Sequence, residues 1–305
     1  MKKILSITLV VLLLSFCSIV SAQDEYAWSV AAPSGAPGVV LSTLAVENPE
    51  AYTFIAADTI TAEFANENSD FIIAPLNAGA KLYKAGKSTY KLGAVVTWGN
   101  LYFASQKENF TLEDINENEL TLFGENTQNA SIALYALEAA GITPKSVSYL
   151  AGAANTQSLL LTDENAIVMT AEPALTAAAM KNENITAYAV NDLYKEATGY
   201  DGFAQAGLFI KAATIEEHPE AVAAFLKALY SAANLVDNDL EVVAEASVAL
   251  ELLPNVKVAM AAIPNCAIRY VSAMDAKEQV EITANVDLSQ FGGSVPADDF
   301  YYGAE

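Results

Sequence analysis

The sequence predicts an α/β protein made of two similar lobes, and three observations support this. Short apolar runs alternate with alanine-rich amphipathic stretches from Trp28 to about Ile210, a pattern typical of strands and helices around a mostly parallel sheet. A weak internal repeat relates two parts of that region. Beyond it the chain becomes helical, because residues 215–234 and 240–252 carry apolar side chains at helical spacing.

Length and composition agree with a folded protein that has a substantial core. The chain has 305 residues, of which 53% are hydrophobic, and its mean hydropathy is +0.27. Acidic side chains number 37 against 15 basic ones, which gives a formal net charge of -22. Such a surface repels nucleic acid and anionic membranes and keeps the protein soluble, so neither is expected as a partner.

The first 22 residues have the pattern of an export signal. Lys2 and Lys3 precede an apolar run over residues 4–14, and the small-residue sequence "VSA" ends at Ala22. The apolar run is short for a membrane span, and the small residues suit cleavage after Ala22. We therefore expect residues 1–22 to be a signal peptide and the mature protein to work outside the cytoplasm.

Cys17 gives an alternative way of processing the same segment. The sequence "LSFC" that ends at Cys17 resembles a bacterial lipoprotein box, in which the cysteine is lipidated, although Phe16 occupies a position that is usually small. Cleavage after Ala22 and lipidation at Cys17 both leave the protein outside the cytoplasm. Cleavage leaves Cys266 as the only cysteine, so the secreted form has no intrachain disulfide.

The internal repeat aligns residues 61–79 with residues 156–174 at a shift of 95, without gaps. Each segment has a helical stretch, a turn rich in Asn, Asp or Glu, a short apolar strand and a helix start made of small residues. Asn77 falls opposite Glu172 in this alignment. The repeat predicts two similar Rossmann-like lobes.

Two extended segments suit the crossings between these lobes, residues 100–105 outward and residues 206–210 on the return. The predicted division is residues 23–104 and 208–305 for the first lobe and residues 105–207 for the second. Two crossing strands leave a cleft between the lobes, and ligands of open α/β sheets bind beyond the carboxyl ends of the strands.

The loops at those strand ends hold the predicted ligand contacts. Gly35 allows close approach of the backbone, Trp98 could stack on a planar ligand, and Glu172 could meet an N–H or ammonium group. The full set is Ser34, Gly35, Ala36, Asn77, Trp98, Gly99, Asn100, Asn126, Thr127, Gln128 and Glu172.

Four of these residues also have a purely structural interpretation. Ser34 and Thr127 are common helix caps, and a lone tryptophan such as Trp98 is often a core residue. An acid such as Glu172 near a helix start is favoured by the helix dipole, with Pro173 in the first turn. Both interpretations of Glu172 remain open at this point.

Five sequence segments together resemble a known family. They are "AAPSGAPGVVLSTLAVENP", "SDFIIAPLNAGAKLY", "AVVTWGNLYFAS", "NAIVMTAEPALTAA" and "FGGSVPADDFYY". Their order resembles extracellular substrate-binding proteins of ABC transporters, in the branch that includes binding proteins for nitrate, alkanesulfonates and thiamine pyrimidine precursors. The resemblance covers nearly the whole chain after the signal. It implies the type II periplasmic binding protein fold and a monomer that captures a small solute and delivers it to a membrane permease.

An enzyme is the alternative, since fold relatives of this branch act in thiamine-precursor and menaquinone synthesis. The only histidine, His218, lies in "EEHPE" at a predicted helix start and is expected on the surface. One histidine and one remaining cysteine cannot supply a usual zinc site, and no P-loop, dinucleotide fingerprint or nucleophile elbow is present. We therefore expect no catalysis, metal or cofactor. A cell-surface structural protein is disfavoured, because it would not need paired strand-end loops.

The charge of the strand-end loops bears on the ligand. The only arginine is Arg269, and none of the predicted site loops contains a basic residue. Receptors for strong anions commonly use arginine or lysine, although helix N-termini alone can hold an anion. The sequence therefore favours a neutral or weakly cationic, planar organic solute. Arg269 is expected to pair with acids on the surface.

Overall fold

The computed structural model describes residues 26–57 and 59–304. The predicted signal peptide and Cys17 lie outside these residues. Within the described chain, every helix is either too short or too polar to cross a bilayer.

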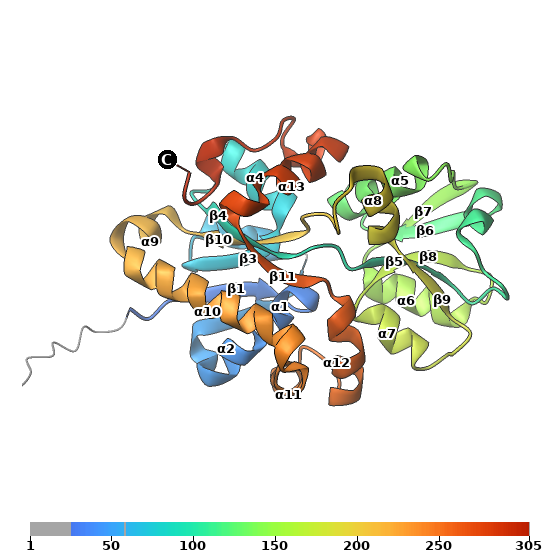
Figure 1. Ribbon diagram of the computed structural model, residues 1–305, viewed down its shortest axis with the longest axis horizontal. Coiled ribbons are helices and arrows are strands. Elements are labelled where there is room, and N and C mark those ends of the chain that lie inside the picture. Colours follow the sequence, from blue (N-terminus) through green and yellow to red (C-terminus); the bar gives the residue numbers. More distant parts are fainter. Residues whose placement is uncertain (1–25, 58, 305) are drawn as a thin grey trace, which may run out of the picture.

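The chain forms two sheets that lie side by side, joined by segments of extended chain (Figure 1). The first sheet has the strand order β11-β4-β10-β3-β1-β2, and the second has the order β7-β6-β8-β5-β9. The strands of the first sheet are β1 (Val30–Pro33), β2 (Tyr52–Ile55), β3 (Phe71–Pro75), β4 (Lys91–Thr97), β10 (Ala206–Ile210) and β11 (Ile268–Ser272). Those of the second are β5 (Leu101–Ser105), β6 (Glu119–Phe123), β7 (Ser146–Leu150), β8 (Ile167–Ala171) and β9 (Thr186–Ala189).

Helices cover both sheets, and each sheet with its helices is called a lobe below. The first lobe contains α1 (Ala36–Val39), α2 (Ser42–Glu47), α3 (Glu63–Asn66), α4 (Leu76–Lys84), α9 (Ala212–Glu217), α10 (Pro219–Asn238), α11 (Leu240–Ala249), α12 (Val256–Ala262) and α13 (Ala273–Val286). The second contains α5 (Gln128–Ala139), α6 (Ala153–Thr162), α7 (Ala174–Ala179) and α8 (Val190–Thr198). Short 3-10 helices span Pro49–Ala51, Ile60–Ala62, Leu112–Glu117, Ile263–Asn265, Leu288–Phe291 and Asp298–Phe300.

The two sheets repeat one arrangement, which confirms the predicted fold class. The order β2-β1-β3-β10-β4 in the first sheet matches β7-β6-β8-β5-β9 in the second. In both, the first three strands are parallel and the fourth is antiparallel to its neighbours. β11 is the one strand of the first sheet without a counterpart among the described residues.

Each antiparallel strand directly follows a crossing between the lobes, and this corrects the predicted lobe boundaries. We placed residues up to 104 in the first lobe, but β5 pairs with β8 and β9 of the second sheet. We placed residues 206 and 207 in the second lobe, but β10 pairs with β3 and β4 of the first. The crossing segments are therefore residues 98–100 and residues 199–205. After each crossing the chain first forms a strand of the sheet that it has just reached, β5 in the second lobe and β10 in the first.

The two crossing segments pack closely against each other. Asn191 of α8 donates its side-chain amide to the carbonyl oxygens of Trp98 (2.9 Å) and Gly99 (2.8 Å). Gly202 has a φ of 100°, and a Cβ there would overlap the carbonyl oxygen of Trp98. A side chain at Gly202 would thus need both an unfavourable backbone conformation and space that the other crossing already fills.

Buried strands place apolar residues on both faces of each sheet. In β3, Phe71 and Ile73 belong to one core cluster, whereas Ile72 and Ala74 belong to another. This division follows from the two-residue period of a strand and explains the continuous apolar run in the sequence. Cys266 is buried in the first of these clusters.

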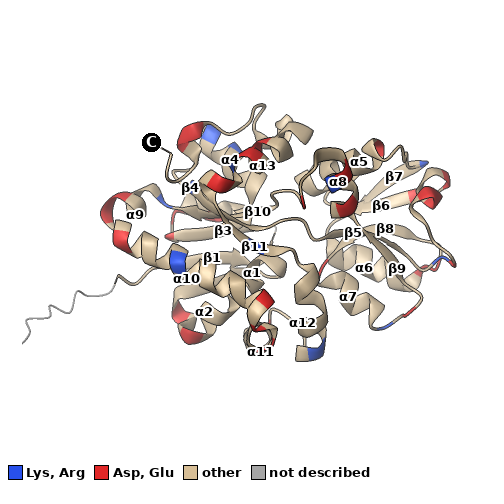
Figure 2. Cartoon of the chain, viewed as in Figure 1, with Lys and Arg blue, Asp and Glu red and all other residues tan. Residues whose placement is uncertain are grey.

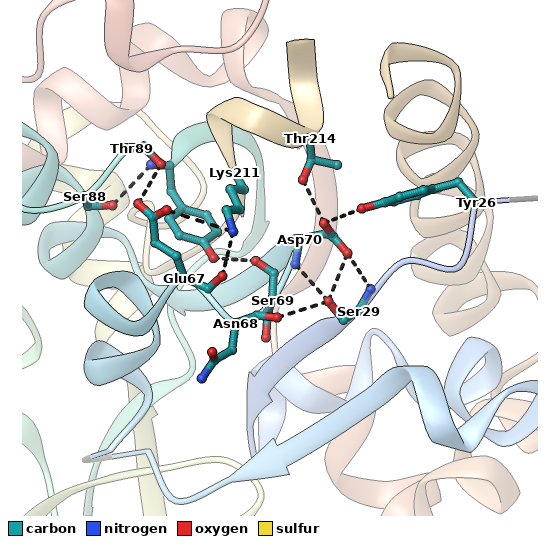
Figure 3. Close-up of polar contacts among 11 residues, drawn as sticks. Tyr26, Ser29, Glu67, Asn68, Ser69, Asp70, Ser88, Thr89, Lys211 and Thr214 are labelled. Carbon is teal, nitrogen blue, oxygen red and sulfur yellow. Dashed lines mark hydrogen bonds and ion pairs between the residues drawn. The ribbon is translucent and has the colours of Figure 1, made fainter. Parts of the chain in front are cut away.

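A carboxylate near the amino end of β3 anchors the beginning of the described chain (Figure 3). Asp70 accepts hydrogen bonds from the hydroxyls of Tyr26 (2.8 Å) and Thr214 (2.8 Å) and from the backbone N–H and hydroxyl of Ser29 (2.8 and 2.9 Å). Burial alone would raise the pKa of Asp70, but these hydrogen bonds outweigh it and lower the pKa. His218, expected on the surface, is half-buried and stacks on the ring of Tyr26, with centroids 3.8 Å apart.

Candidate functional site

The carboxyl ends of the parallel strands lie along the edges by which the two sheets are joined. Ala206 at the start of β10 pairs with both Pro75 and Thr97, so β3 and β4 end at the same edge. In the second sheet Leu101 pairs with Ala171, so β8 ends where β5 begins. Only three residues separate β4 from β5, and these two edges are therefore neighbours.

The loop after β1 leaves open space beside the backbone of Gly35. Gly35 has a φ of 102°, and no atom lies within 4 Å of the place that a Cβ would occupy. Ser34 is exposed and its backbone N–H donates to Ile55 (2.9 Å), whereas Ala36 is buried. The N-cap of α1 is Gly35 and no side chain caps this helix, so the structure does not support a capping role for Ser34. Close approach of a ligand to this loop stays a prediction.

Asn77 lies in the first turn of α4, at the end of β3, and is half-buried. The structure also shows that Leu76, not Asn77, is the counterpart of Glu172. The backbone N–H of Leu76 donates to Gln205, one residue before β10, and that of Glu172 donates to Asn100, one residue before β5, both at 3.0 Å. The alignment by 95 residues is thus displaced by one position at this point.

The residues of the loop after β6 have different roles: one caps a helix and another links the second lobe to a crossing segment. Thr127 is the N-cap of α5, because its hydroxyl oxygen accepts from the backbone N–H of Ala130 (3.4 Å). Gln128 is buried and donates to the carbonyl oxygen of Ala204 (2.7 Å), which ties the second lobe to the returning crossing segment. Asn126 is exposed, with a φ of 57°. Of the three predicted contacts in this loop, Asn126 is exposed, Thr127 is half-buried and Gln128 is buried.

Trp98 begins the outward crossing, and its side chain is buried in a core cluster of the first lobe. Its side chain is 2% exposed, its indole N–H donates to the carbonyl oxygen of Arg269 (2.9 Å), and the Arg269 guanidinium lies 4.6 Å from the ring centroid. Gly99, beside it, is also buried. The prediction that Trp98 stacks on a ligand does not fit this arrangement. Arg269, which we expected to pair with surface acids, instead covers the indole.

Asn100 is the centre of a polar cluster that sequence reasoning identified only in part. It is 6% exposed, and its side-chain amide donates to the carbonyl oxygen of Glu172 (2.8 Å). The side-chain oxygen of Asn100 accepts from the amide of Gln205 (2.9 Å), which also donates to Asn129 (3.3 Å). We did not predict Gln205 or Asn129. Gln205 could have been found, since it directly precedes the predicted return segment, residues 206–210.

Glu172 is almost fully buried and its carboxylate stabilises the start of α7. One oxygen accepts from the backbone N–H of Thr176 (3.1 Å) and the other from its hydroxyl (2.7 Å). The residue is 4% exposed, and this burial raises the pKa of its carboxyl despite the two hydrogen bonds. Burial and the nearby Glu172 carboxylate raise the pKa of Tyr102 to about 12. Glu172 therefore has the structural role at a helix start, and it could contact a ligand only if its carboxylate became accessible.

The predicted strand-end positions carry amide, hydroxyl and carboxylate groups but no cation. Asn77, Asn126 and Ser34 are at least partly accessible, and Gln205 is half-buried. Within residues 26–57 and 59–304, no group of three or more His, Cys, Asp or Glu side chains could hold a metal ion. This arrangement can donate and accept hydrogen bonds on both lobes, and the cation that the structure places beside it is Arg269, over the ring of Trp98.

The fold is that of periplasmic binding proteins, and solved structures share it over nearly the whole chain. An ABC transporter from Parabacteroides distasonis is 20% identical and has a TM-score of 0.77, covering 92% of this chain and 100% of its own. The alkanesulfonate-binding protein SsuA from Xanthomonas axonopodis pv. citri, bound to MOPS, is 13% identical with a TM-score of 0.67, and the match covers 91% and 99%. A Candida albicans protein described as having the generic periplasmic binding protein fold is 10% identical with a TM-score of 0.58, covering 90% and 92%.

The sequence identifies the family within this fold class. Residues 56–239, more than half of the chain, match the model of the NMT1/THI5 like family. The chain belongs to this family, and the resemblance seen in the sequence is confirmed. No curated protein matches the sequence.

Proposed function

We propose that the protein is the solute-binding component of an ABC importer and works outside the cytoplasm. The observation that carries this proposal is the repeated lobe, because it sets two equivalent rows of strand-end loops along neighbouring edges. Loops that end parallel strands are where open α/β sheets bind ligands. The family and the structural neighbours support the same role. A membrane permease would then receive the solute, and the predicted signal at residues 1–22 fits export.

The ligand we propose is a small neutral or weakly cationic organic molecule. Accessible Asn77 and Asn126 offer amide donors and acceptors from the two lobes, and the backbone at Gly35 is open to close approach. The predicted site positions contain no lysine or arginine, although known neighbours of this fold include an alkanesulfonate-binding protein. Planarity of the ligand rested on stacking against Trp98, and the burial of that ring removes the reason to expect it.

Thermal-shift screening of the mature protein tests this function. The panel would contain nitrogen heterocycles, amino acids, vitamins, nucleobases and sulfonates. A ligand present at about 100 times its dissociation constant stabilises the folded state by about 2.7 kcal/mol, which raises the midpoint of unfolding by several degrees. Asn77→Ala and Asn126→Ala should each reduce the shift given by the binding compound. Stabilisation by sulfonates alone would contradict the proposed ligand class.

An enzyme of the same fold is the alternative, and Glu172 is the observation that favours it. A buried carboxyl with a raised pKa is the kind of group that general acid–base catalysis uses. Its two hydrogen bonds to Thr176, within the same helix start, give the carboxyl a structural reason for its position. Any compound from the screen should therefore be recovered unchanged by mass spectrometry after incubation, and conversion to a product would establish the enzyme instead.

A further inference from the structure

A groove of about 530 Å3 lies between α2, α10 and α11 on the first lobe. None of the predicted ligand contacts lines it. The three helices pack against one another around the groove, at the lower side of the lobe in the view of Figure 1. It is therefore a surface feature separate from the proposed solute site.

α11 is apolar on two sides, and only one of them faces the protein core. Val243 and Ala244 are buried in the core, whereas Val242 and Ala249 line the groove, and Val242 is 43% exposed. A helix that is apolar around most of its circumference is normally packed on more than one side. On the groove side, Val242 and Ala249 are exposed, and no element among the described residues covers them.

The other two helices complete a surface shaped for one more helix. α10 contributes Ala228, Ala232 and Leu235, which follow the spacing of one helical face. α2 contributes Leu44 and Val46, of which Val46 is 44% exposed. Small residues beside larger ones create the depressions into which the side-chain ridges of a neighbouring helix fit.

The charges around the groove select the partner. Among the described residues that line it, Glu47 and Glu245 are the only charged ones, and none is a lysine or arginine. Figure 2 shows acidic residues on both α2 and α11. These carboxylates repel anionic lipid head groups, and a second copy of this chain, with its net charge of -22, would be repelled as well. Basic side chains on either side of an apolar face would complement them.

We propose that this groove is a docking site for an amphipathic helix of another protein, with an apolar face flanked by lysine or arginine. The apolar face would cover Val46 and Val242, and the basic residues would meet Glu47 and Glu245. The two sites share no residue, so docking can be measured without any solute.

The test uses a labelled peptide of about 14 residues, roughly four helical turns, with leucine and alanine along one face and lysine on both sides of it. Fluorescence anisotropy measures its binding to the full mature protein. We expect Glu47→Lys/Glu245→Lys to weaken binding about tenfold or more. The control Glu216→Lys/Glu217→Lys changes the charge equally on exposed α9 of the same lobe and should change the affinity less than about twofold.

A second pair of variants tests the apolar part. Val242→Glu should weaken binding about tenfold, whereas Val147→Glu, which changes a 36% exposed valine of the second lobe, should not. Equal losses in the groove and control variants, or no binding of the peptide, would overturn the proposal. Two other results would also overturn the proposal: binding of the protein to phosphatidylglycerol vesicles, and dimer formation in sedimentation. Each counts only if Val242→Glu abolishes it and Val147→Glu does not.

Discussion

Asn100 and Gln205 hydrogen-bond to each other at 2.9 Å and occupy equivalent positions in the two lobes. Each is the last residue before the antiparallel strand of a sheet, and the backbone oxygen of each accepts from the first residue after a parallel strand. The two crossings between the lobes thus meet at a pair of amide side chains. This contact joins the repeat at its centre and lies beside the proposed solute site.

Removal of the Gln205 amide should destabilise the protein. Gln205→Ala leaves the buried side-chain oxygen of Asn100 without its donor, and an unsatisfied buried polar group costs about 1–3 kcal/mol. Urea unfolding monitored by circular dichroism measures the change. Gln279→Ala on α13 is the control and should change the free energy of unfolding by less than about 0.5 kcal/mol. Equal stability of the two variants would show that the amide pair contributes nothing.

Gly202→Ala should destabilise the protein more than Gly86→Ala. Both glycines have a positive φ, so both substitutions strain the backbone. A Cβ at Gly86 meets nothing within 4 Å, whereas one at Gly202 overlaps the carbonyl oxygen of Trp98. The difference between the two variants therefore reports the close contact of the crossings, and we expect about 1–3 kcal/mol in urea unfolding. A difference near zero would mean that the crossings separate easily.

Asp70→Asn should destabilise the protein at neutral pH and much less in acid. The hydrogen bonds that Asp70 accepts favour its charged form in the folded protein, so the pKa of the carboxyl is lower than in the unfolded chain. Stability from such a group is present above its unfolded pKa, near 4, and disappears as the pH falls through the folded pKa.

The expected cost of Asp70→Asn at pH 7 is about 1.5–3 kcal/mol, the range for hydrogen bonds to a charged group. Unfolding of both proteins followed from pH 7 down to about pH 3 should show this difference shrinking. Asp237→Asn, an exposed acid of α10, removes the same charge and should show little dependence on pH. A cost of Asp70→Asn that is constant with pH would contradict the lowered pKa.

Glu172→Gln should have the opposite dependence on pH. Burial raises the folded-state pKa of this carboxyl, so its contribution is fully present below the unfolded pKa and is lost as the pH rises through the folded pKa. The stability of the Gln variant relative to the original protein should therefore increase between pH 4 and pH 8 in urea unfolding. If the Gln variant instead lost stability relative to the original protein over this interval, the folded protein would favour the ionised carboxylate of Glu172.

The parts of the fold with strong local signals could be predicted from the sequence. The apolar runs of β3 and β8 are buried on both faces, and their repetition gave the two lobes. The membership of β5 and β10 could not be predicted, because a strand that follows a crossing has the same apolar pattern whichever sheet it joins. The burial of Trp98 could not be predicted either, because it depends on a contact with Arg269, which is distant in sequence.

The position of β10 dictates an order of folding. This strand lies between β3 and β4 and pairs with both, yet it follows the whole second sheet in the chain. The strands of the second sheet are contiguous in sequence, from β5 to β9. As the chain emerges during synthesis, β1 to β4 lack their central strand until residues 206–210 have followed the second sheet. The half that begins the protein is therefore the half that finishes folding last, and until then its exposed strand edges are what a chaperone would need to protect.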